Sequence, residues 1–148
     1  MAPLWLLGDA LEHLRPFVSE LAGLHGRLAM LQLLVPPVRL ATEDVARIIP
    51  ALLAVLRDTV LHQVEDPMTR LCAGKAPAAT VVVEATVASA VLRLSVRDDG
   101  VPSTESASAL AARIGTLGVA FTDAANGARS LAMPLRYWDG AISAAGAA

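Results

Sequence analysis

The fold is decided by two consecutive β-rich runs, TVVVEATVA at residues 80–88 and AVLRLSVR at residues 90–97. The second run alternates apolar and polar side chains, which is the period of a strand with one buried face. Because only Ser89 separates the two runs, we expect them to pair as an antiparallel hairpin. A polar turn at residues 98–105 follows and ends the second strand.

Three segments around this hairpin have the apolar spacing of amphipathic helices. In residues 9–24, Pro16 is expected to begin the helix or to kink it. In residues 42–62, Thr42 is the expected N-cap, because two acidic residues follow it in the first turn. The third helix is expected over residues 107–117.

Further strands complete the expected secondary structure. The apolar run at residues 28–35 is short enough to be a strand buried on both faces, and residues 38–40 are expected to extend it as a bulged piece. Two strands at 119–123 and 128–134 are expected to pair around Asn126-Gly127, a strong turn dipeptide. Strands that cluster with helices between them predict a two-layer α/β sandwich, in which helices cover one face of a mixed, mainly antiparallel sheet.

The composition fits one compact domain and excludes several classes of function. The chain has 148 residues, of which 55% are hydrophobic and 18% charged, so it can build a core. A net charge of -2 without a basic run argues against nucleic acid as a partner, and no apolar stretch is long enough to span a membrane. The single cysteine, Cys72, excludes an internal disulfide. We therefore expect one cytoplasmic domain over residues 1–148, with a mobile tail at 141–148.

Three sequence blocks in the centre of the chain follow one another at a specific spacing. They read RDTVLHQVE at residues 57–65, RLCAGKAP at 70–77 and DDGVP at 98–102. They resemble the N box, the following loop and the D-D-G-x-G turn of the ATP-binding domain of CheA-type chemotaxis histidine kinases, which belong to the GHKL group. The segment 118–135 resembles the closing hairpin of that family, so the resemblance covers most of the chain.

The resemblance implies the histidine-kinase-like ATPase (Bergerat) sandwich and a nucleotide site. Asp58 stands where the family has the asparagine that holds Mg²⁺, and Asp98 stands where it has the aspartate that reads adenine. Structural alternatives stay open: His62 can cap a helix C-terminus, Lys75 can be a solvated loop residue, and Asp98 to Gly100 can form a simple β-turn. The candidate nucleotide-binding residues are Asp58, His62, Lys75, Asp98 and Gly100, with Asp58 as the candidate Mg²⁺ ligand.

The chain departs from the family pattern where the family encloses the triphosphate. Only residues 101–106 separate Gly100 from the next helix, an interval in which the family has a Gly-rich loop and a mobile lid. Pro102 replaces the next family glycine, which removes a backbone N–H and fixes φ. We therefore expect a degenerate domain with no cofactor and no efficient ATP turnover. Such a domain would act as a binding or regulatory module in bacterial two-component or chemotaxis-like signalling.

Two other functions stay open. One is an ATP- and Mg²⁺-binding GHKL domain with residual kinase or ATPase activity, through Asp58 and Asp98. The other is a histidine phosphotransferase that uses His13 or His62. The expected partners are a signalling protein of the kinase or response-regulator type, or a second copy of this chain. The expected contact residues, chosen as exposed apolar or aromatic side chains, are Leu61, Val101, Leu110, Tyr137 and Trp138.

Overall fold

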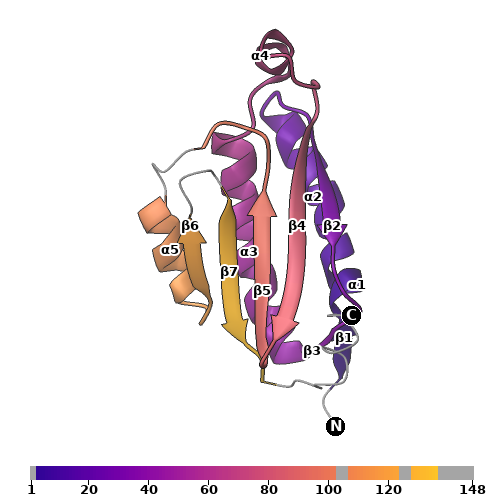
Figure 1. Cartoon of the computed structure of the whole chain (residues 1–148), viewed down its shortest axis with the longest axis vertical. Helices are drawn as coiled ribbons and strands as arrows, with labels where there is room; N and C mark the ends of the chain where they lie inside the picture. Colours follow the sequence, from indigo (N-terminus) through magenta and orange to yellow (C-terminus); the bar gives the residue numbers. More distant parts are fainter. Residues whose placement is uncertain (1–2, 103–106, 124–127, 137–148) are drawn as a thin grey trace.

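The computed structural model describes residues 3–102, 107–123 and 128–136. Within these residues, the strands form a five-stranded sheet in the order β2-β4-β5-β7-β6 and a separate pair, β1 with β3. Helices cover one face of the larger sheet, and α4 projects beyond one end of it (Figure 1). The helices are α1 (Leu7–Glu12), α2 (Leu14–Leu24), α3 (Thr42–His62), α4 (Pro67–Cys72) and α5 (Ala107–Gly115). The strands are β1 (Leu4–Leu6), β2 (Ala29–Leu34), β3 (Arg39–Ala41), β4 (Ala79–Ala88), β5 (Val91–Arg97), β6 (Ala120–Asp123) and β7 (Arg129–Pro134).

The architecture confirms the predicted α/β sandwich. In the larger sheet β2 pairs parallel with β4, while β4 with β5, β5 with β7, and β6 with β7 pair antiparallel. The long helix α3 packs behind the sheet and supplies the centre of the core. Its buried apolar residues are Ile48, Ala51, Leu52, Val55, Leu56 and Val60.

The central hairpin forms as predicted, and its register places apolar residues of both strands in the core. Val83 lies opposite Val96, and Ala85 lies opposite Leu94, and all four side chains are buried. Two residues make the turn, Ser89 with φ of 52° and Ala90 with φ of 61°. Positive φ at both turn residues matches the right-handed twist of the strands in two-residue hairpins. The hairpin of β6 and β7 is also confirmed, although the expected turn at Asn126-Gly127 lies outside the described residues.

Strand β2 corrects two sequence predictions. It is not buried on both faces: Ala29 and Leu31 are buried, whereas Met30 is 57% exposed, because helices cover only one face of the sheet. The segment at residues 38–40 is not a bulged extension of this strand. After the two prolines that follow β2 the chain turns away, and β3 pairs antiparallel with β1 instead.

The helix boundaries also differ from the predicted ones. The first helical segment is divided at His13, and Pro16 is the third residue of α2, where a missing N–H breaks no intrahelical bond. Thr42 is not the N-cap of α3, because Ala41 takes that position. The Thr42 hydroxyl instead accepts a hydrogen bond of 3.0 Å from the indole Nε1 of Trp5, which ties β1 to the start of α3.

The outer edge of β2 is protected by side chains of α2. Arg15 Nη1 donates to the carbonyl of Leu31 at 2.6 Å, and the Ser19 hydroxyl donates to the carbonyl of Ala29 at 3.4 Å. An edge strand with free carbonyls is a template for pairing with another chain.

In the described part of the chain, no helix is long and apolar enough to cross a membrane, and the tail at 141–148 lies outside it.

We expect Arg15→Met to lower the free energy of unfolding by about 1 kcal/mol and to promote self-association, because the carbonyl of Leu31 loses its donor. Urea unfolding and light scattering measure the two effects. Glu12→Gln is the matched control, since it removes the ion pair to Arg15 but leaves the bond to Leu31 in place. Equal association by both variants would contradict the role of Arg15 as an edge cap.

Candidate functional site

The five candidate nucleotide-binding residues lie at one end of the sheet. Asp58 and His62 are in the last two turns of α3, Lys75 follows α4, and Asp98 and Gly100 follow β5. Three segments that are distant in sequence therefore meet here, as the blocks of residues 57–65, 70–77 and 98–102 require. Several of their contacts are made with residues that the sequence analysis did not name as candidates.

The carboxylate of Asp58 is held by a buried arginine. Arg129, the first residue of β7, is 1% exposed, and its Nη1 donates to Asp58 Oδ2 at 2.5 Å. A second carboxylate, that of Asp123 on β6, lies 3.6 Å from Arg129 Nε. The carboxylate that the resemblance suggests as a Mg²⁺ ligand is thus engaged in an ion pair within the chain.

Gln63 connects this ion pair to the turn after β5. In the amide orientation that satisfies its neighbours, its oxygen accepts from Arg129 Nη2 at 2.7 Å, and its nitrogen donates to Asp98 Oδ1 at 3.0 Å. The other carboxylate oxygen, Asp98 Oδ2, accepts from the backbone N–H of Gly100 at 2.8 Å. Both oxygens of Asp98 therefore have partners within the protein.

Gly100 lies where the turn after β5 meets the end of α3. The next residue, Val101, donates its N–H to the carbonyl of Gln63 at 2.9 Å. A Cβ on Gly100 would lie 1.9 Å from that same carbonyl oxygen. Glycine is therefore needed here for close backbone approach, and the bond from the Gly100 N–H to the Asp98 side chain is that of an Asx turn.

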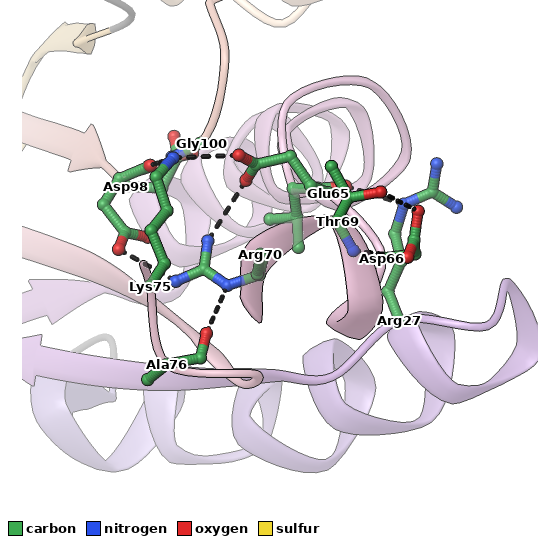
Figure 2. Close-up of polar contacts among 11 residues, drawn as sticks. Arg27, Glu65, Asp66, Thr69, Arg70, Lys75, Ala76, Asp98 and Gly100 are labelled. Carbon is green, nitrogen blue, oxygen red and sulfur yellow. Dashed lines mark hydrogen bonds and ion pairs between the residues drawn. The ribbon is translucent and has the colours of Figure 1, made fainter. Parts of the chain in front are cut away.

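Lys75 belongs to a second ion-pair network, centred on a buried arginine (Figure 2). Arg70, at 1% exposed, donates to Glu65 Oε1 at 3.1 Å, to Asp99 Oδ2 at 2.8 Å and to the carbonyl of Ala76 at 2.7 Å. Lys75 Nζ donates to Glu65 Oε2 at 2.8 Å and to the carbonyl of Asp99. Lys75 is thus not a solvated loop residue, because it fastens the loop after α4 to the turn after β5.

Two neighbouring carboxyl groups in this turn have pKa values shifted in opposite directions. The hydrogen bond from Arg70, helped by its charge, holds the pKa of Asp99 below its ordinary value of 3.8, although partial burial opposes it. Burial raises the pKa of Asp98 above 3.8, against the hydrogen bond from the N–H of Gly100, and the charge of Asp99 adds to the rise. Ionised Asp99 therefore favours the folded state, whereas ionised Asp98 disfavours it.

The remaining candidates have different environments. His62 is the last residue of α3, and its Nε2 lies 3.8 Å from Asp58 Oδ1, too far for a hydrogen bond. Leu61 is partly buried and Val101 is 58% exposed. Leu110 is 3% exposed and packs in the core, so the prediction that it forms part of an exposed apolar surface is wrong. Tyr137 and Trp138 lie outside the described residues.

Among residues 3–102, 107–123 and 128–136, no group of three or more His, Cys, Asp or Glu side chains could hold a metal ion.

The sequence analysis did not name the two arginines that organise the site, Arg70 and Arg129, as candidates. A signal for Arg129 existed, since it shares the inward alternation of Leu131 and Met133 along β7. A charged residue in such a position needs a buried partner.

No family model matches the chain, and no curated protein matches it in sequence. Solved structures do match it. The blue-light activated histidine kinase EL346 of Erythrobacter litoralis has 19% identity and a TM-score of 0.65 over 88% of this chain and 46% of its own. The histidine kinase AdeS of Acinetobacter baumannii has 12% identity and a TM-score of 0.57, with 93% of this chain and 70% of its own covered.

The chain matches some of these structures over only part of their length. It spans slightly less than half of the EL346 chain but 96% of the separate catalytic domain of the histidine kinase ThkA, at 12% identity and a TM-score of 0.58. At these identities the similarity establishes the fold, which is that of histidine kinase catalytic domains. This confirms the fold that the three sequence blocks implied.

We expect Gly100→Ala to lower the free energy of unfolding by about 2–3 kcal/mol, because the new Cβ must displace the carbonyl of Gln63. Urea unfolding measures the change. Gly23→Ala is the matched control: it lies in α2 with nothing within 4 Å of the added Cβ, so it should be neutral or stabilise by up to about 1 kcal/mol. A Gly100→Ala variant as stable as the control would rule out the close approach.

The two shifted carboxyl groups predict pH effects of opposite sign. The parent chain should have a higher free energy of unfolding than Asp99→Asn above pH 3.8. This difference should disappear as pH falls through the lowered pKa of Asp99 in the folded state. The stability of Asp98→Asn relative to the parent should instead increase as pH rises from 3.8 through the raised folded-state pKa. Because Asp99 is 57% exposed, its effect should be at most about 1 kcal/mol.

Urea unfolding across this pH range separates the two carboxyl groups. If the free energy of unfolding of each variant differed from that of the parent by an amount that does not change with pH, neither carboxyl would change its proton affinity on folding.

Proposed function

We propose that this domain is a histidine-kinase-like signalling module that does not bind Mg²⁺ and ATP productively and that acts through protein contacts. The ion pair between Asp58 and Arg129 is the observation that carries the proposal. A divalent cation at Asp58 would have to displace a buried guanidinium or bind beside its positive charge. Breaking a buried ion pair by removing one partner costs about 3–5 kcal/mol, and Arg129 is only 1% exposed.

The side chains present therefore fit Mg²⁺ poorly. Hard cations need several oxygen ligands, and Asp123, the second carboxylate beside Arg129, faces the same arginine as Asp58. His62, which lies beside Asp58, offers nitrogen rather than oxygen. Without the metal, the cation that bridges the nucleotide phosphates in the resembled family is lacking at this place, so a catalytic role is not expected.

The adenine and phosphate ends of a nucleotide meet similar obstacles. Both oxygens of Asp98 already accept a hydrogen bond, one from Gln63 and one from the N–H of Gly100, so the exocyclic amine of adenine would have to share an oxygen with one of them. Only residues 101–106 join Gly100 to α5, and Pro102 lacks an N–H, so this interval offers little backbone for enclosing phosphates. Both observations support a function that needs no nucleotide.

Isothermal titration of the chain with Mg·ATP is expected to give no saturable heat at millimolar nucleotide, and no phosphate should be released on incubation. Circular dichroism of the same sample provides the folding control. Saturable, Mg²⁺-dependent binding would contradict the proposal and favour the alternative of a nucleotide-binding GHKL domain. In that case, loss of the heat in Asp98→Asn would assign adenine recognition to this carboxylate.

A further inference from the structure

The structure contains a groove between α3 and α5, and we propose that it binds an acidic, amphipathic helix of a partner protein. The inference rests on the proposed function, because it names the kind of partner for a domain that acts without nucleotide. Two adjoining pockets form the groove, one of about 430 Å³ and one of about 240 Å³. Ala54 of α3 and Arg113 of α5 line both pockets, so the two are continuous.

The larger pocket is mainly apolar, and small side chains account for its depth. Ala54 on α3 and Ala112 on α5 leave space between the helices that longer side chains would fill. Pro50, Ile114 and Leu117 line the rest of this half. A partner can bury apolar side chains here, at roughly 25 cal/mol for each Å² removed from water.

The smaller pocket has a positive lining. Arg57 and Arg113 face it from the two helices, and His62 lies at its end. In the described part of the chain, neither guanidinium makes an ion pair. The one carboxylate in the lining, Asp58, is paired with the buried Arg129, which also faces Asp123. This half of the groove therefore has uncompensated positive charge and favours Asp or Glu side chains on its occupant.

The combination of the two halves selects the occupant. A small anion would use the arginines and leave the apolar half empty, whereas an acidic amphipathic helix uses both. A helix laid into a groove between two others contacts them through residues at i, i+3, i+4 and i+7. Since α5 has 9 residues and is about 13 Å long, two to three turns of a partner helix match its length.

A phage-displayed library of helical peptides, selected on the purified full chain, tests the proposal. We expect the enriched peptides to place Asp or Glu beside Leu or Met on one face. Fluorescence anisotropy of a labelled enriched peptide should show binding that is weakened about tenfold or more by Arg57→Glu with Arg113→Glu. Arg93→Glu, an exposed arginine on the uncovered face of the sheet, is the matched control and should bind as the parent does.

Each of the following results would overturn the proposal of an acidic helix as occupant. Failure to enrich any peptide, enrichment of peptides without acidic residues, or binding that survives both reversals would exclude an acidic helix. Displacement of the peptide by inorganic phosphate would identify a small-anion site instead. A dimer of the parent chain that the reversals convert to a monomer in sedimentation would make a second copy the occupant.

The failure of this inference can be told apart from failure of the proposed function. Absence of peptide binding together with absence of Mg·ATP binding rejects the groove alone. Saturable Mg·ATP binding that also displaces the peptide rejects the proposed function, because the groove would then be part of a nucleotide site.

Discussion

The buried ion pair between Arg129 and Asp58 is the interaction on which the site end of the molecule depends. It joins the start of β7 to the last turns of α3, and through Gln63 it reaches Asp98 in the turn after β5. Replacing a buried pair by apolar residues is often neutral, but removing one partner leaves an uncompensated charge in the core. The pair is therefore best understood as fixing how three segments meet, rather than as a source of net stability.

The fold of a kinase catalytic domain is present here, but the side chains at its site end pair with one another. The fold is that of histidine kinase catalytic domains, and solved structures match it over 88% or more of the chain. A metal site needs carboxylates that remain available to an external cation. Here Asp58 and Asp123 face Arg129, and Glu65 and Asp99 face Arg70. Asp58, the carboxylate that the sequence suggests as a Mg²⁺ ligand, thus serves as a counterion within the structure.

The sequence predicts those parts of the fold that depend on local patterns. Strands β4 and β5 are adjacent and alternate, so their pairing follows from the sequence alone. The exposure of Met30 does not, because an apolar run contains no information on which face of a sheet the helices cover. Thr42 has the local sequence of an N-cap, but its hydroxyl accepts a hydrogen bond from Trp5, which lies 37 residues earlier. These errors share a cause, which is a tertiary contact that overrides a local preference.

In the candidate site, too, the sequence does not reveal which tertiary contacts each side chain makes. The spacing of the three blocks places Asp58, Lys75 and Asp98 at one end of the sheet, because the helix and strands that hold them are correctly predicted. What each side chain does there depends on Arg129, which is 71 residues from Asp58. Its inward position on β7 can be read from the alternation with Leu131 and Met133, but its partner cannot. A motif thus locates a site, whereas the buried counterions around it decide whether the site remains open to a ligand.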